Sequence, residues 1–347
     1  MSSMSYKMPA EWEKQEGLLL CYPTNGNDWP GKYASIQWVF IEYITTVARF
    51  QKVFVVVNNK DLKDKVILQL KKNYANLTQI EFIIHATNRS WMRDSSAIIV
   101  KNNKERQALD FNFNGWAKYS NHRLDKHTPK AVANYLKITY NQVTYQNIPF
   151  VLEGGAIDVN GQGTLITTEE CLLDKTIQVR NPKFTFKEAY ENVFNTYLGI
   201  NQTIWLGKGI AGDDTHGHVD DLCRFTDEKT VVCVQETNPK DENYKPLKEN
   251  WERLQNITLH NKNKLQVVAL PMPRLIWFDD MRLPASYANF IIINNAVLMP
   301  TFNDANDYKA LGILQECFPN RQVIGIHCLD LIWGLGTLHC LSQQIPV

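Results

Sequence analysis

Two kinds of hydrophobic pattern alternate along the chain. Stretches with apolar residues at the spacing of an amphipathic helix are followed by short β-branched runs typical of strands, then by a polar or glycine-containing loop and a hairpin. The second unit shows the hairpin best, over 156–167, where Asn160-Gly161 is a strong turn signal. The other units predict helices near residues 62–72, 186–198, 244–260 and 306–318, followed by strands near 80–85, 203–206, 266–270 and 322–326.

The loops of these units recur at a regular distance. Asp94 lies 59 residues before Glu153, and Glu153 lies 65 residues before His218. From His218 to Cys340 the distance is 122 residues, or two periods of 61, so a fourth loop is expected near residue 280, in Trp277-Phe278-Asp279-Asp280. Five repeats of this length in one chain favour a closed ring over a rod. We therefore predict an α/β fold built as a five-bladed pseudo-symmetric propeller, whose loops meet at its axis.

The two ends of the chain bear on this closure. The fifth unit stops soon after Cys340, before its hairpin is complete. The strand expected at 17–22 would supply the missing strand and seal the ring, as terminal strands do in propellers. Residues 1–347 would then form a single domain.

Composition narrows the range of partners. Lys plus Arg (37) nearly equals Asp plus Glu (36), and no basic run resembles a footprint for a phosphate backbone, so nucleic acid is not an expected partner. Residues 1–15 lack a signal-peptide pattern and no apolar stretch approaches a membrane span, so we expect a soluble, cytoplasmic protein without a membrane partner. The seven cysteines include no Cys-x-x-Cys pair, which argues against a disulfide framework and a thiolate zinc site.

The predicted loop positions combine a thiol, an imidazole and several carboxylates. An imidazole such as His218 would lower the pKa of the Cys340 thiol and make it a nucleophile. Neighbouring carboxylates would raise that pKa, so the site is reasonable only if the substrate brings a positive charge. A guanidinium fits, because its planar fork matches carboxylates such as Asp94 and Asp220, which would present its central carbon to the sulfur. This combination indicates hydrolysis of an amidine.

Six segments carry a resemblance to a known family. They are Trp91-Met92-Arg93-Asp94, Leu152-Glu153-Gly154-Gly155, the run 163–173 that ends in Cys171-Leu172-Leu173, Gly217-His218-Val219-Asp220-Asp221, the run 282–290 that begins Arg282-Leu283-Pro284, and His339-Cys340-Leu341-Ser342-Gln343-Gln344. In this order they resemble agmatine deiminase and its bacterial peptidylarginine deiminase-type relatives, over nearly the whole chain from residue 8 to residue 346. The resemblance implies the five-bladed α/β propeller, or pentein fold, of the guanidine-modifying superfamily.

The resemblance also implies a mechanism. Cys340 attacks the guanidinium carbon, and His218 protonates the departing ammonia and then activates water against a thiouronium intermediate. Glu153 orients His218, while Asp94 and Asp220 clamp the guanidinium. With agmatine as the small-molecule substrate, the products are N-carbamoylputrescine and ammonia. No cofactor and no metal are implied.

Two further residues concern the far part of the substrate. The resemblance places Asp214 in the substrate site and Trp91 in an aromatic wall. Considered alone, Asp214 is equally well a turn or helix cap, and Trp91 is more often a core residue. Deimination of arginine residues in peptides is the alternative within the same class, and a pocket open at the surface would favour it.

Three segments depart from the family pattern. Ser95-Ser96 follows Asp94 where a Gly-Pro-like pair is common, and Tyr22-Pro23 stands where Trp-Pro is usual. The run 114–118, which contains Ala117, is not of the usual Trp-Gly-Gly type. The residues with implied catalytic roles are unchanged, so the departures concern the wall of the pocket and the far end of the substrate.

Interpretations from other classes stay open. In a strand, His216-x-His218-x-Asp220 would present two imidazoles and a carboxylate on one face, as in a metal-dependent hydrolase, although Gly217 weakens the strand. A propeller-like binding module without a reactive thiol is another alternative. The other six cysteines are expected to pack in the core. A helix over 35–49 would pack on its own sheet or form a subunit interface of a homo-oligomer.

Overall fold

The computed structural model describes residues 6–347 and shows a mixed α/β fold. Residues 1–5 belong to the segment in which no signal peptide is expected, and they lie outside the described residues. Within residues 6–347, no helix has the length and apolar character needed to cross a membrane.

The described part of the chain contains several small sheets, most of which share one strand arrangement. In five of them, an antiparallel pair is extended by parallel pairing. Their strands are β20 (Ser342–Pro346) with β1 (Gln15–Cys21), β2 (Lys52–Val57) and β3 (Ile80–Ile84); β4 (Ile98–Lys101), β5 (Arg106–Asp110) and β6 (Thr139–Gln142); β9 (Asp158–Val159), β10 (Thr164–Thr168) and β11 (Gln202–Leu206); β12 (Cys223–Phe225), β13 (Thr230–Gln235) and β14 (Gln266–Pro271); and β17 (Ile291–Ile293), β18 (Ala296–Thr301) and β19 (Gln322–His327). Two separate hairpins are β7 (Thr144–Tyr145) with β8 (Ile148–Pro149), and β15 (Trp277–Phe278) with β16 (Met281–Arg282).

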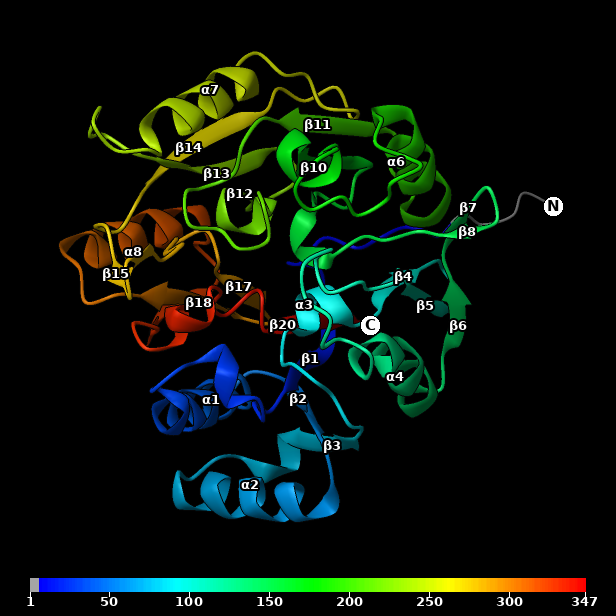
Figure 1. The fold of residues 1–347 in the computed structure, drawn as a ribbon, viewed down its shortest axis with the longest axis vertical. Coiled ribbons are helices and arrows are strands. Elements are labelled where there is room, and N and C mark those ends of the chain that lie inside the picture. Colours follow the sequence, from blue (N-terminus) through cyan, green and yellow to red (C-terminus); the bar gives the residue numbers. More distant parts are fainter. Residues whose placement is uncertain (1–5) are drawn as a thin grey trace.

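The longer helices lie toward the outside of these sheets in Figure 1, and the short helix α3 lies near the centre. The helices are α1 (Tyr33–Val47), α2 (Lys60–Lys72), α3 (Met92–Ser95), α4 (Thr128–Leu136), α5 (Glu169–Leu172), α6 (Lys187–Val193), α7 (Tyr244–Leu254) and α8 (Ala305–Cys317). The described sheets are small, and none closes on itself. The α/β class of the prediction is therefore confirmed, whereas the five-bladed propeller is not.

Side-chain spacing explains the position of α1. Ile36, Phe40 and Ile44 recur every four residues and are fully buried, so this face of α1 packs against the sheet that contains β2. Trp38 points away and is 62% exposed. The inward packing favours the core interpretation of the predicted helix at 35–49, and the oligomeric state stays a prediction.

Of two further predicted helices, one ends at the expected residue and the other ends earlier. The helix expected over 186–198 is α6 followed by a π-helix over Phe194–Leu198, and it stops at Gly199, whose φ of 70° lies in the left-handed region. The helix expected to reach residue 260 ends at Leu254, and Asn256 beyond it adopts a left-handed φ of 62°.

Strand β1 joins the two ends of the chain. Leu18 pairs with Gln344 in antiparallel register to β20, and β1 also pairs in parallel register with β2. The prediction that an N-terminal strand completes the last unit is confirmed. Because β20 begins two residues after Cys340, the pairing of β1 with β20 fixes the position of Cys340 just before its strand.

The prediction of a site loop near residue 280 is wrong. Asp279 and Asp280 form the left-handed turn of the β15–β16 hairpin, and Phe278 stacks on Trp333. The loop that precedes the antiparallel pair of the fourth unit is instead the one before β17. It contributes Asn289, whose contact with Cys340 is described below.

Candidate active site

The predicted catalytic residues come from loops that enter different sheets. Asp94 lies in α3, before β4, and Glu153 lies shortly before β9. His218 precedes the 3-10 helix Val219–Asp221 and β12, and Cys340 precedes β20. Each of these four residues is at most 5% exposed. The sheet plan therefore buries, in one region, residues that are far apart in the sequence.

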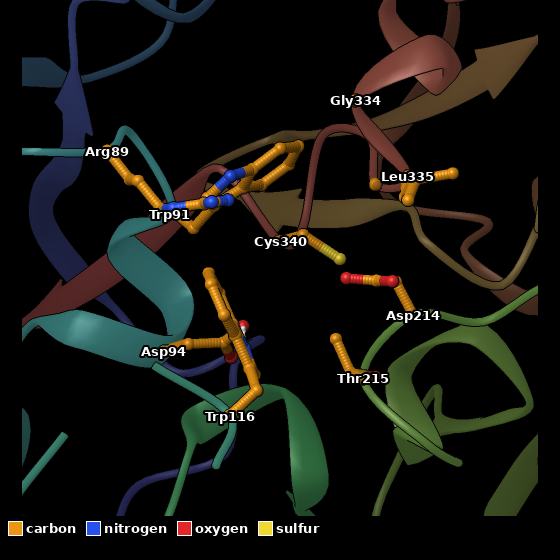
Figure 2. A pocket seen from close by; sticks show the side chains of 10 residues that line it. Arg89, Trp91, Asp94, Trp116, Asp214, Thr215, Gly334, Leu335 and Cys340 are labelled. Carbon is orange, nitrogen blue, oxygen red and sulfur yellow. Dashed lines mark hydrogen bonds between the residues drawn. The ribbon is translucent and has the colours of Figure 1, made fainter. Parts of the chain in front are cut away.

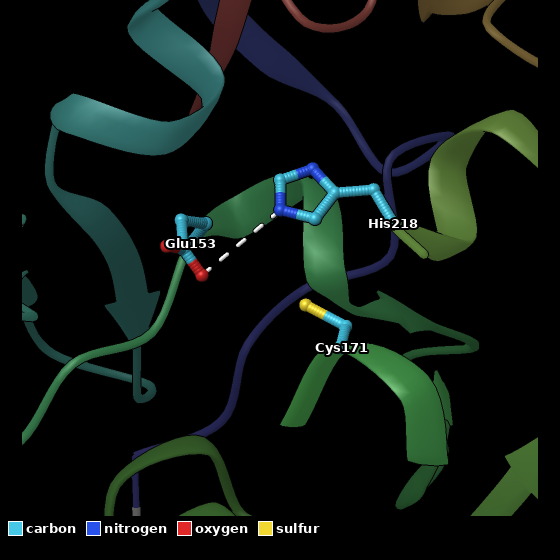
Figure 3. A group of neighbouring side chains, drawn as sticks. All are labelled: Glu153, Cys171 and His218. Carbon is cyan, nitrogen blue, oxygen red and sulfur yellow. Dashed lines mark ion pairs between the residues drawn. The ribbon is translucent and has the colours of Figure 1, made fainter. Parts of the chain in front are cut away.

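His218 lies where several of these loops meet. Its Nδ1 is 3.9 Å from Asp94 Oδ1 and 4.0 Å from Asp220 Oδ1, and its Nε2 is 4.0 Å from Glu153 Oε2 (Figure 3). Burial favours the neutral imidazole, but Asp94, the adjacent Cys171 sulfur and Asp220 outweigh it and raise the pKa of His218 well above its usual value. The ring is therefore positioned to carry a proton in the resting site.

Gly155 is required by this close approach. A Cβ atom at Gly155 would lie 2.5 Å from His218 Nδ1 and 2.9 Å from Asp94 Oδ1. Its backbone N–H donates to the same Asp94 oxygen at 3.1 Å. The second glycine of the Glu153-Gly154-Gly155 run thus makes room for the imidazole and fixes a carboxylate.

The Cys340 thiol is surrounded by acids and contacts one amide. Asn289 Nδ2 donates to Cys340 Sγ at 3.0 Å, and the thiol donates to Asp220 Oδ2 at 3.5 Å. Burial raises the pKa of Cys340 well above its usual value, and Asp220, Asp221 and Asp94 act in the same direction. These influences favour the protonated thiol, and a cation that enters the site would favour the thiolate.

Asp94 and Asp220 are held by different donors. Trp116 Nε1 donates to Asp94 Oδ2 at 2.9 Å. Burial raises the pKa of Asp94 to about 6; the charge of His218 lowers this pKa, and the charge of Asp220 raises it. Asp220 Oδ2 lies 2.7 Å from His339 Nδ1, and this hydrogen bond, together with the nearby positive charges, outweighs burial and lowers the pKa of Asp220. Asp220 is therefore the more readily ionised member of the pair.

His339 connects the site to a buried ionic cluster. Its Nε2 lies 2.8 Å from Glu11 Oε2, which also accepts from Arg224 at 3.0 Å and lies 3.6 Å from Arg93 Nη2. Burial alone would raise the pKa of Glu11, but Arg224, His339 and Arg93 lower it overall. Both ring nitrogens of His339 thus face carboxylates, so Glu11 supports Asp220 through this ring.

Glu153 is fixed on its other side by Arg180. Arg180 Nε donates to Glu153 Oε1 at 3.0 Å, and both side chains are fully buried. Glu153, His218 and Cys171 present one oxygen, one nitrogen and one sulfur within 4.8 Å of one another. Asp220, Asp221 and Cys340 form a second such group, so these two are the sets in the described chain with metal-ligand spacing.

Several buried polar atoms of the site have no hydrogen-bond partner within the described chain. They are Glu153 Oε2, both ring nitrogens of His218, and Asp220 Oδ1. Buried polar atoms are nearly always paired, so these unpaired carboxylate oxygens, which face opposite ring nitrogens of His218, are available to groups that donate hydrogen bonds. A planar cation with several N–H groups supplies such donors.

A pocket opens above Cys340, and Figure 2 shows the sulfur pointing into it. Its lining residues are Arg89, Trp91, Asp94, Trp116, Asp214, Thr215, Gly334, Leu335, Gly336 and Cys340. Trp91 therefore borders the pocket, as the resemblance implied, although it is only 5% exposed and also packs on Trp29. Thus the core interpretation and the wall interpretation of Trp91 are both compatible with its position.

The side chain of Asp214 also faces the pocket. The capping role that the sequence left open belongs to its neighbour Asp213, which accepts from the backbone N–H groups of Thr215, Gly217 and His218. The carboxylate of Asp214 accepts instead from Lys118 and from Tyr119, whose hydroxyl lies 2.8 Å away.

A strand through His216, which the metal-site alternative would require, is not present. His216 has a left-handed φ of 65°, and residues Val219–Asp221 form a 3-10 helix. His216 Nε2 lies 3.2 Å from Asp174, and His216 belongs to neither group with metal-ligand spacing. The alternative in which His216, His218 and Asp220 share one face of a strand is therefore wrong.

Most of the departures from the family pattern lie behind the pocket. Ser95 donates to the carbonyl oxygen of Trp91 at 2.9 Å, and Ser96 ends α3. Tyr22 is 2% exposed and donates to Gln69 at 2.8 Å. Ala117, with a left-handed φ of 54°, is next to the pocket residue Trp116. Among these positions, the run 114–118 is the one that shapes the pocket.

The sequence interpretation missed several residues of the site. Asn289 lies 51 residues before Cys340, so the period of 61 did not indicate it, although it falls within the resembling run 282–290. His339 directly precedes Cys340, and its role depends on the distant residue Glu11. Cys171 was expected to pack in the core. It is indeed buried, but it also borders His218.

Comparisons with known proteins agree with this geometry. Residues 7–346 match the family described as Porphyromonas-type peptidyl-arginine deiminase. A relative from Marinomonas sp. (strain MWYL1), named "Putative agmatine deiminase", is 34% identical over 360 residues, covering 98% of this chain and 94% of that relative. The structure of an agmatine deiminase from Enterococcus faecalis has 28% identity and a TM-score of 0.89, covering 100% of this chain and 98% of that one.

A second solved structure is a cysteine-to-serine variant of the agmatine deiminase of C. jejuni with substrate bound. It has 31% identity and a TM-score of 0.87, and the match covers 99% of this chain and 97% of that one. Both the sequence and the fold therefore match over almost their full length. The chain belongs to the Porphyromonas-type peptidyl-arginine deiminase family, a family of hydrolases that act on the carbon–nitrogen bonds of amidines.

Proposed function

We propose that this protein hydrolyses agmatine to N-carbamoylputrescine and ammonia, with Cys340 as the nucleophile. The observation that carries the proposal is the unpaired buried oxygen Asp220 Oδ1, on the carboxylate that accepts from the Cys340 thiol, together with the neighbouring carboxylate of Asp94. A guanidinium offers the positive charge and the N–H groups that these atoms lack. Similarity to solved agmatine deiminases over the full length supports the same substrate.

Binding of the guanidinium prepares the nucleophile. Asp94 and Asp220 hold the planar group, and its charge offsets the carboxylates that keep Cys340 protonated. Asp220 Oδ2, 3.5 Å from Cys340 Sγ, accepts the thiol proton and returns it to the sulfur at the end of the cycle. The thiolate then attacks the guanidinium carbon, and Asn289 stabilises the sulfur before the attack with its 3.0 Å hydrogen bond.

His218 handles the protons of the later steps. The charged imidazole gives its proton to the departing amino group, so ammonia leaves and a thiouronium remains on Cys340. The now neutral ring takes a proton from water, and the resulting hydroxide attacks the same carbon. Collapse of this adduct breaks the carbon–sulfur bond and releases the urea product, while the hydroxyl proton passes to the released ammonia and the sulfur leaves as a thiolate. Glu153, anchored by Arg180, keeps the imidazole oriented and favours its charged form.

The fold supports a finer proposal. The antiparallel-then-parallel plan recurs in five described sheets, and β1 pairs with β20 to complete the sheet that follows Cys340. We place these sheets as five blades of an α/β propeller with the catalytic loops at its axis. This arrangement explains how loops of four sheets supply one site.

A substrate comparison tests the proposed function. Ammonia release is measured with agmatine, free arginine and a peptide with a C-terminal arginine, and N-carbamoylputrescine is identified by mass spectrometry. We expect the highest kcat/KM for agmatine and no turnover by Cys340→Ala that retains the wild-type melting temperature. Higher kcat/KM for the peptide would reassign the substrate to peptidyl arginine. Full activity of Cys340→Ala would disprove the mechanism.

A further inference from the structure

We propose that Lys118 selects the charge that the pocket accepts at the far end of a guanidinium substrate. Its ammonium occupies Asp214, the carboxylate that a terminal ammonium of the substrate would use. A substrate such as agmatine must displace Lys118, whereas a substrate with a terminal carboxylate gains Lys118 as a partner. This inference rests on the proposed deimination at Cys340 and assigns a determinant of its substrate range.

Asp214 has both carboxylate oxygens occupied in this structure. Lys118 Nζ donates to Oδ1 of Asp214, and the hydroxyl of Tyr119 donates to Oδ2 at 2.8 Å. Asp214 nevertheless lines the pocket, and Figure 2 shows its carboxylate directed toward the Cys340 sulfur. The partners of Asp214 therefore decide what this end of the pocket can bind.

The other cation at the mouth is already neutralised. Arg89 lines the pocket, pairs with Asp28 at 3.1 Å, and stacks over the ring of Tyr119 with 4.1 Å to its centroid. The mouth thus carries two closed ion pairs, Arg89 with Asp28 and Lys118 with Asp214. To bind a substrate whose far end is charged, the pocket must open one of these two ion pairs. The exposed fractions of the two basic side chains indicate which pair opens.

Lys118 is the more easily released partner. Its side chain is 43% exposed, against 14% for Arg89, so Lys118 can turn into solvent at small cost. It is carried by an unusual turn in which Gly115, Trp116 and Ala117 have consecutive left-handed φ values of 68°, 58° and 54°. Trp116 is fixed in this turn by its hydrogen bond to Asp94. Strained residues persist where surrounding contacts hold them, and here they place Lys118 at the mouth.

Three substrates of similar chain length separate the charge effect from shape. They are agmatine, butylguanidine and 4-guanidinobutanoate, which end in an ammonium, a methyl group and a carboxylate. KM and kcat are compared between the wild type and Lys118→Met, with Lys118→Gln as a second variant and the exposed Lys130→Met in α4 as the matched control.

Removal of the Lys118 charge is expected to change KM in opposite directions for the substrate with a terminal ammonium and the substrate with a terminal carboxylate. We expect KM to fall about threefold to tenfold for agmatine and to rise by a similar factor for 4-guanidinobutanoate. These changes are modest because exposed ion pairs contribute little free energy. For butylguanidine, which has no charged far end, KM should stay unchanged. The value of kcat should change little, since Lys118 acts on the far end of the substrate and not on the reacting carbon. Lys130→Met should match the wild type with all three compounds. A merely structural role for Lys118 would shift all three KM values together.

The effect must also depend on Asp214. In an Asp214→Asn background, the Lys118→Met change should no longer lower KM for agmatine, which a double-mutant cycle measures. Unchanged KM values in both Lys118 variants, or shifts in the same direction for both charged substrates, would overturn the inference while leaving the proposed function intact. If the wild type releases no ammonia from any guanidinium compound, the proposed function itself fails.

Discussion

Asn289 and Cys340 are linked by a hydrogen bond of 3.0 Å from the amide to the sulfur. The same amide nitrogen donates to Asp221 at 2.9 Å, so Asn289 stands between the thiol and one of the carboxylates that raise its pKa. Its oxygen accepts from Thr337 and from the backbone of His339, which fixes the loop before Cys340. One side chain thus positions the proposed nucleophile and favours its ionised form.

Asn289→Ala should therefore slow the reaction. Loss of a hydrogen bond to a developing thiolate corresponds to about a tenfold to hundredfold decrease in kcat/KM. The rate of Cys340 alkylation by iodoacetamide in the presence of a guanidinium ligand should fall in parallel. Alkylation at the wild-type rate, in a variant with reduced turnover, would show that Asn289 acts on a later step and not on the sulfur.

Guanidinium binding should depend on the ionisation of Asp94. Burial raises the pKa of this carboxyl to about 6, so Asp94 is protonated below that pH and loses its attraction for a cation. His218 is charged throughout this range, because its pKa is well above the usual value. We expect the affinity of Cys340→Ala for agmatine, measured by calorimetry, to fall as the pH decreases through about 6.

A second variant isolates the group responsible. Cys340→Ala combined with Asp94→Asn has no carboxyl at this position, so its weak agmatine binding should show no titration near pH 6. A titration that survives the Asp94 substitution would assign the pH dependence to another group.

The Glu11 cluster should support both stability and the site. Glu11→Gln leaves Arg224 and Arg93 buried without their shared carboxylate, which costs about 3–5 kcal/mol for a buried pair. Glu13→Gln is the matched control. Glu13 is two residues away and its salt bridges with Lys7 and Lys101 are partly exposed, so its loss should cost less than about 1 kcal/mol. Urea unfolding of both variants measures the difference, and equal stabilities would contradict the assigned role of Glu11.

The sequence predicted what depends on local pattern and on order along the chain. The period between Asp94, Glu153 and His218 located three site loops, and the unfinished last unit indicated the pairing of β1 with β20. The prediction from the period failed near residue 280. An inserted hairpin, β15–β16, displaces the fourth loop there, and a fixed period does not account for an insertion.

Long-range contacts account for the other failures. The link from Glu11 to His339 spans 328 residues, and nothing local to either residue predicts it. Asp214 was ambiguous because capping and pocket-lining aspartates look alike in a sequence, and only the hydrogen bonds of Asp213 separate them. Contacts of this kind require the three-dimensional arrangement of the loops.

Removal of metal ions should leave the activity unchanged. His216 pairs with Asp174 instead of joining His218, so the two imidazoles do not converge as a metal-dependent hydrolase would require. Enzyme dialysed against a chelator should keep its kcat/KM for agmatine, and added Zn²⁺ should not increase it. A loss of activity on dialysis that Zn²⁺ restores would favour the metal-dependent interpretation.

Ala117→Gly should stabilise the protein. Ala117 has a left-handed φ of 54°, which costs an L-residue about 1–2 kcal/mol, whereas glycine adopts it freely and loses about 0.5–1 kcal/mol of that gain through the flexibility of its unfolded state. We expect a net increase of about 0.5–1 kcal/mol in the free energy of unfolding, measured in urea. Ala133→Gly is the control, because Ala133 lies within α4 and its replacement should cost about 1 kcal/mol or more. If Ala117→Gly lowers the free energy of unfolding as Ala133→Gly does, packing of the Ala117 methyl group stabilises the protein by more than its left-handed φ destabilises it.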